Sequence, residues 1–254
     1  MDPLLKLEDL SVHFSGLKAL TDVSFDAHAA EVRAVIGPNG AGKTTLFNAI
    51  SGYVESTAGA IHFKGEPIHS LSPHDISIKG VRRTFQNGGL FPELTALENI
   101  LAGLHTQIAG SFLGIVFGSR TSREAEREGI ERARKLLDLM DLGFLADQQV
   151  KDLSGGQQRM VEIVRTLATE PPLLLLDEPF VGLSPPMRIR MMEIIRKLAG
   201  EEGIGILLIE HAIDLVMSSS DVIVVLSSGQ VIAEGKPEEV RENREVLEAY
   251  LGYA

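Results

Sequence analysis

Hydrophobic and polar positions alternate along the first part of the chain, which predicts strands with one buried face. Leu5, Leu7 and Leu10 are separated by charged residues, and Val23 and Phe25 repeat the two-residue spacing. This period is typical of half-buried β-strands. A compact apolar segment, residues 32–36, then runs directly into a glycine-rich turn. We therefore expect the chain to begin with a β-rich region.

The middle of the chain changes to helical spacing. One set of apolar residues lies on a single helical face: Ile130, Ala133, Leu136, Leu137 and Met140. A second set follows from about Gly156: Met160, Ile163, Val164 and Leu167. The segment 121–124 has the pattern of a capping box, which starts helices. Residues 88–168 are therefore expected to form a helical insertion.

Continuous apolar runs return in the last third of the chain. They are residues 173–176, 204–209 and 222–226. A helical pattern over 186–198 separates the first two runs. Unbroken runs of Leu, Ile and Val between helices are typical of strands covered on both faces, as in a parallel sheet. We expect residues 1–87 and 169–254 to form one α/β core around the helical insertion.

Composition narrows the class of protein. Of 254 residues, 44% are hydrophobic and 23% are charged, which excludes disordered and collagen-like chains. The formal net charge of −11 argues against nucleic acid as a partner. The chain has no cysteine, which excludes disulfides and thiolate metal sites. The longest apolar stretch that could suggest a membrane span, residues 108–118, is far shorter than the roughly 20 residues of a spanning helix. We therefore expect no membrane span.

One motif points to phosphate binding. Residues 37–44 read GPNGAGKT and fit the pattern G-x-x-x-x-G-K-[ST], between a predicted strand and a predicted helix. Glycines let backbone N–H groups surround phosphate oxygens, Lys43 supplies charge to the β- and γ-phosphates, and Thr44 offers a hydroxyl to Mg²⁺. A plain glycine-rich turn is the alternative. The residues expected to line this nucleotide-phosphate site are Gly37, Pro38, Asn39, Gly40, Ala41, Gly42, Lys43, Thr44 and Thr45. Such a site alone leaves kinases, GTPases and motor ATPases open.

Two acidic residues follow the apolar run 173–176. Asp177 and Glu178 follow four leucines, and ligands sit beside the carboxyl ends of strands in a parallel sheet. Asp177 is expected to hold Mg²⁺ through water, and Glu178 to polarise the attacking water as a general base. The alternative is that the two acids cap a strand and face solvent. The pair and the phosphate loop together predict phosphoryl transfer.

A further motif resembles a known family. Residues 153–157 read LSGGQ, which resembles the signature of ATP-binding-cassette ATPases. The resemblance implies a P-loop NTPase (RecA-like) core with an N-terminal antiparallel β subdomain and an inserted α-helical subdomain. It also implies a head-to-tail dimer, in which the signature contacts the ATP of the other subunit. The signature residues are Ser154, Gly155, Gly156 and Gln157.

Other positions match this family in order along the chain. By resemblance, Gln86 contacts Mg²⁺ and relays to the membrane partner, His211 contacts the γ-phosphate, and Phe14 stacks on adenine. A strand phenylalanine such as Phe14 is otherwise more often a core residue. Ser184 departs from the family pattern, which usually has Asp or Asn there. Lys43, Glu178 and His211 are the expected catalytic residues, and Thr44, Gln86 and Asp177 are the expected magnesium ligands.

Three segments resemble a narrower group, the ATPase subunits of branched-chain amino acid importers. They are RTFQN at 83–87, LFPELTALENI at 90–100 and the ending GKPEEV…VLEAYLG. This resemblance implies a second ABC ATPase subunit, two transmembrane permease subunits and, indirectly, an extracytoplasmic solute-binding protein. It implies a peripheral position on the cytoplasmic face of the cell membrane. Importers of urea, short amides or aromatic acids, and soluble assembly ATPases of the same fold, are the alternatives.

Overall fold

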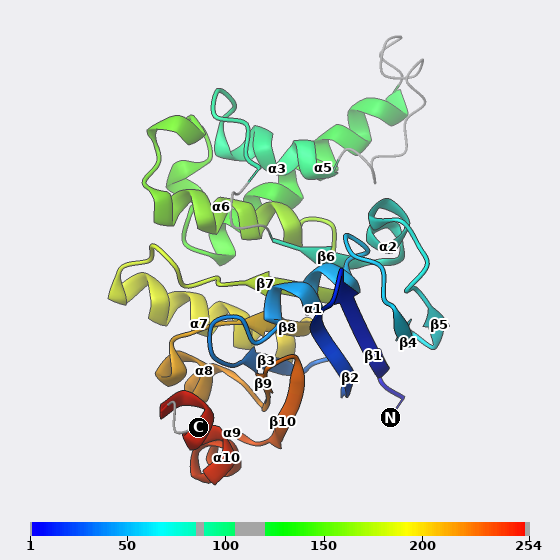
Figure 1. Cartoon of the computed structure of the whole chain (residues 1–254). Coiled ribbons are helices and arrows are strands. Elements are labelled where there is room, and N and C mark those ends of the chain that lie inside the picture. The colour runs from blue at the N-terminus through cyan, green and yellow to red at the C-terminus, as the bar shows by residue number, and fades with distance from the viewer. Residues whose placement is uncertain (1, 85–88, 105–119, 252–254) are drawn as a thin grey trace. The chain divides into compact units, whose positions relative to one another are not determined.

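The computed structural model describes residues 2–84, 89–104 and 120–251. Within these ranges the strands form two sheets, one of four strands and one of six (Figure 1). The expected α/β architecture is confirmed. Gln86 and the apolar stretch 108–118 lie outside the described residues.

The smaller sheet is antiparallel, as the resemblance implied. Its strands run in the order β2 (Leu17–Ala27), β1 (Leu5–Phe14), β4 (Ala58–Phe63) and β5 (Glu66–Pro67). Leu5, Leu7 and Leu10 are buried, so the predicted one-sided strand pattern is confirmed. Ser15 and Gly16 both have positive φ, which suits the two-residue turn that joins β1 to β2.

The larger sheet is parallel except at one edge. Its order is β10 (Gln230–Gly235), β9 (Val222–Ser227), β3 (Val32–Ile36), β8 (Gly205–Ile209), β7 (Leu173–Asp177) and β6 (Val81–Arg83). Only β10 pairs antiparallel, through a hairpin with β9. Every residue of β3, β7 and β8 is buried, which confirms the prediction drawn from the continuous apolar runs. Arg33 is the one charged residue within β3, and it pairs with Glu31 and Glu234.

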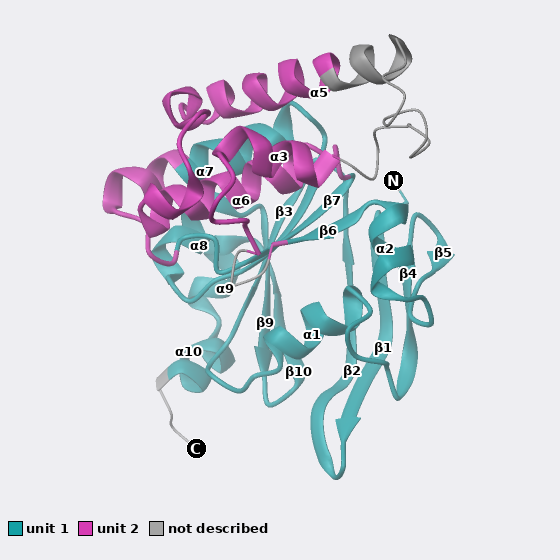
Figure 2. Cartoon of the chain, turned by 90° about the horizontal axis from the view of Figure 1, so that it is seen from above, with its two compact units in different colours: residues 1–83, 172–180, 191–254 teal, residues 84–171, 181–190 magenta. Residues whose placement is uncertain are grey.

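The chain divides into two compact units (Figure 2). The first unit comprises residues 1–83, 172–180 and 191–254, and it contains both sheets. The second unit comprises residues 84–171 and 181–190, a wider range than the expected helical insertion at 88–168. Helix α7 (Pro185–Gly200) begins in the second unit and ends in the first.

Short helices complete the first unit. Helix α1 (Lys43–Ile50) follows β3 and buries Leu46, Phe47 and Ile50 in the core of this unit. Helix α2 (Pro73–Lys79) was not predicted from the sequence; its first turn is capped by the Ser72 side chain. The remaining helices are α8 (Ile213–Ser219), α9 (Pro237–Glu242) and α10 (Arg244–Leu251).

The second unit is helical over its described residues. Its helices are α3 (Ala96–Leu104), α5 (Arg120–Leu139) and α6 (Gly155–Leu167), with short 3-10 turns at Gly143–Leu145 and Val150–Asp152. Ala133 and Leu137 of α5 are buried, as are Met160 and Val164 of α6, so both predicted apolar faces are confirmed. Because α5 already begins at Arg120, the segment 121–124 lies inside the helix and not at its cap.

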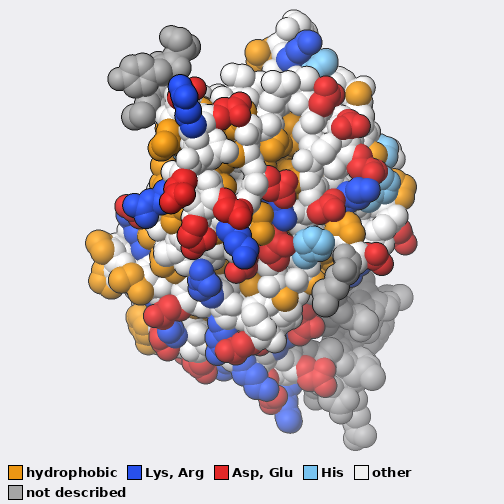
Figure 3. All heavy atoms as spheres, turned by 90° about the horizontal axis from the view of Figure 1, so that it is seen from below, with side chains coloured by type: hydrophobic (Ala, Val, Ile, Leu, Met, Phe, Trp, Pro, Cys, Tyr) orange, Lys and Arg blue, Asp and Glu red, His pale blue; other side chains and the backbone are white. Residues whose placement is uncertain are grey.

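No helix of the described chain combines the length and the apolar character needed to cross a membrane. Acidic and basic side chains are interspersed over the face of the molecule drawn in Figure 3. The net charge of −11 is therefore not gathered into a single acidic area on that face.

Candidate functional site

The segment 37–42 leaves β3 and turns sharply into α1. Gly37 and Gly42 both have positive φ, at 152° and 103°. A Cβ atom on Gly37 would lie 2.0 Å from the Leu226 carbonyl oxygen, and one on Gly42 would lie 2.6 Å from the Ala19 carbonyl oxygen. Both distances are far below van der Waals contact, so only glycine fits at these two positions. The loop is therefore shaped by close backbone packing as well as by turn geometry.

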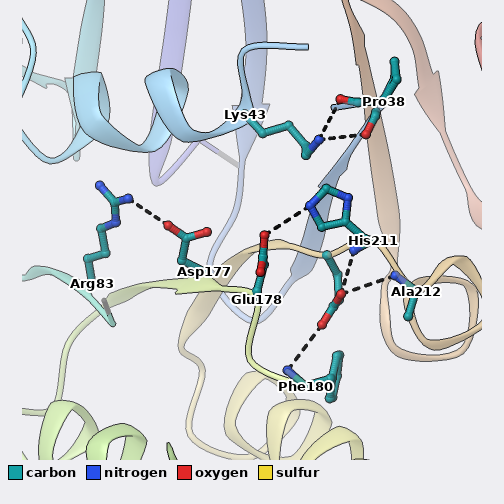
Figure 4. Close-up of polar contacts among 10 residues, drawn as sticks. Pro38, Lys43, Arg83, Asp177, Glu178, Phe180, His211 and Ala212 are labelled. Atoms are coloured by element: carbon teal, nitrogen blue, oxygen red, sulfur yellow. Dashed lines mark hydrogen bonds and ion pairs between the residues drawn. The ribbon is translucent and has the colours of Figure 1, made fainter. Parts of the chain in front are cut away.

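The lysine of this loop is held by the loop itself. Lys43 is only 6% exposed, and its Nζ donates to the carbonyl oxygens of Gly37 at 2.7 Å and Pro38 at 3.0 Å (Figure 4). Burial lowers the pKa of Lys43 below its ordinary value, and the negative charge of Glu178 partly opposes that effect. Phosphate oxygens are stronger acceptors for an ammonium group than peptide carbonyls are. An anion in the loop would thus gain a preplaced positive charge.

The start of α1 also favours an anion. Its first turn contains no acidic residue, so the positive end of the helix dipole is not neutralised there. Thr44 is exposed and Thr45 is half-buried, which leaves the Thr44 hydroxyl accessible. Of the other predicted ligands, Asn39 and Gly40 are exposed and Pro38 is half-buried. Ala41 is buried, so it can offer a ligand only its backbone.

The two predicted acids differ in their surroundings. Asp177 is the last residue of β7 and is 3% exposed, so it does not face solvent. Glu178 follows in the left-handed backbone region at φ 50°, and its N–H donates to the Ile209 carbonyl oxygen at 2.9 Å. Positive φ is unfavourable for a side chain of this kind and is found where surrounding structure enforces it. The backbone of Glu178 is therefore fixed against the end of β8.

The side chain of Glu178 meets the predicted histidine. Its Oε1 lies 3.1 Å from Nε2 of His211, which follows β8 by two residues (Figure 4). Lys43, Asp177, Glu178 and His211 all belong to the first unit. The structure thus brings the predicted catalytic carboxylate and the predicted histidine into direct contact.

Sequence reasoning missed a third acid beside this pair. Glu210 is 3% exposed and accepts backbone N–H groups from His211 at 2.6 Å and from Phe180 and Ala212 at 3.3 Å each. Its carboxylate joins the segment after Glu178 to the segment around His211. The available signal was its place directly after a buried apolar run, the same place that singled out Asp177.

Sequence reasoning also gave no role to Arg83 as a side chain. Its guanidinium Nη2 donates to Asp177 Oδ2 at 2.8 Å, and both side chains are buried (Figure 4). Burial of a carboxylate is costly unless it is paired with a cation or hydrogen-bonded. Arg83 is the cation paired with Asp177.

The LSGGQ segment begins helix α6 in the second unit. The Gln157 N–H donates to Ser154 Oγ at 3.3 Å, and the Ser154 N–H donates to Gln157 Oε1 at 2.9 Å, which together form a capping box. Gly156 is buried, and a Cβ atom there would come within 3.2 Å of Leu183 and Met187. A Cβ atom on Gly155 would have no neighbour within 4 Å. One glycine of the pair thus serves packing, and the other leaves the helix start open.

The two remaining sequence predictions concern aromatic stacking and the position of Ser184. Phe14 ends β1 and is 45% exposed, so it is not a core residue and could stack on a planar ligand. Ser184 is exposed directly before α7, and its carbonyl oxygen accepts the Arg188 N–H. The serine side chain is shorter than the Asp or Asn side chain that is usual at this position in the family.

The donor set suits magnesium with a nucleotide. Within the described residues, no three acidic or histidine side chains converge as a ready-made metal site. Magnesium needs no such cluster, because it is usually held by one or two carboxylates together with substrate phosphates and water. Asp177 and the Thr44 hydroxyl are groups of the required oxygen chemistry.

Comparisons with known proteins identify the family of the chain. The family model for ABC transporters matches residues 20–181, and the model for branched-chain amino acid ATP-binding cassette transporters matches residues 230–254. The chain is 43% identical to the high-affinity branched-chain amino acid transport ATP-binding protein BraF of Pseudomonas aeruginosa over 99% of both chains. It is 40% identical to the corresponding protein LivG of Salmonella typhimurium, again over 99% of both.

Solved structures give the same result. The chain resembles an ATP-binding cassette of an ABC transporter in its ADP conformation, with a TM-score of 0.86 and 34% identity over 99% of this chain and 100% of that one. It also resembles a dimeric cassette bound to ADP and phosphate, with a TM-score of 0.77 and 28% identity over 92% of this chain and 98% of that one. The family resemblance and the P-loop NTPase fold are thereby confirmed. The chain belongs to the ABC transporter family, as an ATP-hydrolysing cassette.

Proposed function

We propose that this chain is the ATPase subunit that powers a membrane importer for branched-chain amino acids. The proposal is supported by relatives named for that transport, which match nearly the whole chain. It is also supported by the match of residues 230–254 to the model specific for that group. These findings favour this substrate class over urea, short amides, aromatic acids or a soluble assembly role.

The hydrolytic step is proposed for the first unit. ATP lies with its phosphates in the loop 37–44, where Lys43 contacts the β- and γ-phosphates and Phe14 stacks on adenine. Glu178 accepts a proton from water as the water oxygen bonds to the γ-phosphorus and the bond to the ADP oxygen breaks. His211 contacts the γ-phosphate. The contact between Glu178 and His211 at 3.1 Å is the observation that carries this assignment.

Magnesium is proposed as the cofactor of this step. Thr44 and Asp177 would hold it, together with Gln86, which lies outside the described residues. When bound, the ion neutralises charge on the phosphate oxygens. Lys43 adds a second positive charge from the loop, and Arg83 remains paired with Asp177.

The signature is proposed to act on a second subunit. Ser154, Gly155 and Gln157 lie at the start of α6, where backbone N–H groups and the helix dipole favour a phosphate. The open space around Gly155 supports approach by ATP held in a partner cassette. The partner is a second copy or a different ABC ATPase, and two permease subunits complete the importer at the cytoplasmic face of the membrane. A solute-binding protein acts only through the permeases.

Two experiments test this function. The tagged chain, purified from detergent-solubilised membranes of its native host, should recover two multispanning permeases and a second cassette ATPase. A strain lacking the chain should lose uptake of labelled leucine, and the wild-type chain but not Glu178→Gln should restore it. Recovery of soluble partners alone, or loss of urea or aromatic-acid uptake in place of leucine uptake, would contradict the proposal.

A further inference from the structure

Arg83 ends the edge strand β6, and its guanidinium connects the end of β7, which carries Asp177, to the region of helix α1, which carries Thr44. Nη2 donates to Asp177 Oδ2 at 2.8 Å, at the end of β7. Nη1 donates to two residues of the α1 region, Asn48 Oδ1 at 2.7 Å and Ser51 Oγ at 3.1 Å. The guanidinium also lies 5.5 Å from the centre of the Phe47 ring. All these residues belong to the first unit.

The contacts on α1 involve the helix face that carries Thr44. Asn48 follows Thr44 by four residues and Ser51 follows it by seven, which is the spacing of one helical face. A guanidinium that holds Asn48 and Ser51 therefore fixes the rotation of α1 about its axis, and with it the position of the Thr44 side chain. The same guanidinium fixes one oxygen of Asp177.

We propose that Arg83 is a positioning residue for magnesium, which holds the Asp177 carboxylate in a set orientation relative to the Thr44 face of α1. This inference rests on the proposed function, in which Thr44 and Asp177 hold the ion. In this role Arg83 acts through Asp177 and is not itself a ligand of the ion. It acts as the outer partner of a metal-binding carboxylate, and such partners orient the ligands they touch.

The chemistry of arginine matters in this position. A guanidinium presents several N–H groups in a fixed plane, so one group can serve Asp177 while another serves Asn48 and Ser51. A lysine ammonium is a point charge without this planar fork. Replacement by lysine would keep a positive charge near Asp177 but would not hold both elements in one geometry.

Mn²⁺ binding to the ADP-loaded full-length protein tests the inference without using activity. Electron paramagnetic resonance gives the Mn²⁺ dissociation constant, and calorimetry in EDTA gives ADP affinity without metal. Loss of an outer partner of a metal ligand costs about 10–100-fold in metal affinity. Because Asp177 is expected to hold the ion through water, Arg83→Met should weaken Mn²⁺ binding by about tenfold, the low end of that range. ADP affinity in EDTA should change less than about twofold, because the phosphate loop is untouched. Arg83→Lys should weaken Mn²⁺ binding at least about threefold.

Arg82→Met is the matched control. Arg82 is the preceding residue of the same strand, and its guanidinium donates to the Ser77 hydroxyl rather than to Asp177. This variant loses an arginine of equal size, and its Mn²⁺ affinity should remain that of the wild type. If Arg83→Met does not fold, Arg83→Lys decides, because it retains the positive charge.

Asp177→Asn separates this inference from the proposed function. If Asp177→Asn weakens Mn²⁺ binding but Arg83→Met and Arg83→Lys do not, Arg83 has no positioning role and the proposed function stands. If Asp177→Asn leaves Mn²⁺ affinity unchanged, the metal role of Asp177 fails and the role of Arg83 fails with it. If the wild-type chain does not bind ADP, the proposed function itself is wrong. Weakening in both Arg83 variants, with Arg82→Met unchanged, is the result we expect.

Discussion

Glu178 and His211 are in direct contact, with Oε1 of the glutamate 3.1 Å from Nε2 of the histidine. The contact follows from the sheet. Asp177 and Ile209 are paired on the adjacent parallel strands β7 and β8, so the residues that follow them emerge at the same edge. The positive φ of Glu178 then turns its side chain to meet that of His211. One carboxylate and one imidazole of catalytic type are thereby brought together where β7 and β8 end.

Glu178→Gln tests the role of this carboxylate. The amide cannot accept a proton from water, so steady-state ATP hydrolysis should fall by roughly 10²–10⁴-fold. Nucleotide affinity should be retained, because the phosphate loop is unchanged. Phosphate release gives the rate, and a nucleotide titration gives the affinity. Hydrolysis within a few-fold of wild type would remove Glu178 from the role of general base.

Glu210→Gln tests the buried acid that the sequence did not reveal. Its carboxylate accepts the N–H groups of Phe180, His211 and Ala212, and an amide has only one acceptor oxygen for them. Leaving a buried donor unsatisfied costs about 1–3 kcal/mol, so the free energy of unfolding should fall by that amount. Turnover should fall as well, because Phe180 and His211 donate to different oxygens of Glu210 and a single amide oxygen no longer links the segments that follow Glu178 and precede Ala212.

Glu201→Gln is the control for this measurement. Glu201 is exposed and pairs with Lys197 at 3.8 Å on the surface, so its loss should change stability by less than about 0.5 kcal/mol. Chemical denaturation of the three proteins gives the comparison. Equal stability for Glu210→Gln and Glu201→Gln would show that the buried hydrogen bonds are not needed.

Local features of the site could be predicted from the sequence, whereas the partners of Glu210 and Arg83 could not. The strand ending at Asp177 was predictable, because burial on both faces demands an unbroken apolar run. The cap at Ser154 was predictable, because its partner Gln157 lies three residues away. The partners of Glu210 and Arg83 were not, since Phe180 is 30 residues from Glu210 and Asp177 is 94 residues from Arg83. Contacts of this kind depend on strand order, which local patterns do not specify.

The missed helix has a similar physical reason. Helix α2 has seven residues and buries only Ile76, so it has too few turns to show a repeated apolar face. Proline at its start and Gly80 at its end were the available signals. A cap at residue 121 would start α5 at residue 122, two residues after its observed start at Arg120, which is within the usual spread of helix ends.

The pKa of Lys43 predicts how nucleotide affinity depends on pH. Burial lowers this pKa below the ordinary value of 10.5. Only the protonated amine attracts phosphate, and bound phosphate in turn favours the proton. Affinity for ADP in EDTA should therefore be constant near neutral pH. As the pH rises, the affinity should begin to fall before the pH reaches 10.5. The fall should approach tenfold per pH unit, as expected for the loss of one proton.

Titration of ADP into the protein at rising pH measures this effect, with circular dichroism to confirm that the fold persists. Lys43→Ala is the reference, since its affinity should be weak at every pH and should not fall in the alkaline range. A wild-type affinity that stays constant beyond pH 10.5 would contradict the lowered pKa.

Alanine at two loop glycines separates backbone strain from steric overlap. Gly40 and Gly42 both have positive φ, which disfavours alanine at either position by roughly 1 kcal/mol. A Cβ atom on Gly42 would also overlap the Ala19 carbonyl oxygen and the Leu20 side chain, whereas Gly40 has nothing within 4 Å. Gly42→Ala should therefore lower the melting temperature well beyond Gly40→Ala. Equal melting temperatures would show that the loop can move away from Ala19.

Ser154→Arg, compared with Ser154→Ala, tests whether the signature acts across a dimer. Both variants remove the hydroxyl that caps α6, so both should lose about 1 kcal/mol of stability. Only arginine adds bulk at a helix start that is exposed beside the open Gly155. Ser154→Arg should therefore abolish turnover, whereas Ser154→Ala should reduce it much less. Because the phosphate loop lies in the other unit, ADP affinity of the isolated monomer should be the same in both. Loss of ADP binding by the Ser154→Arg monomer would mean that the signature serves its own chain, and the proposed head-to-tail dimer would then be wrong.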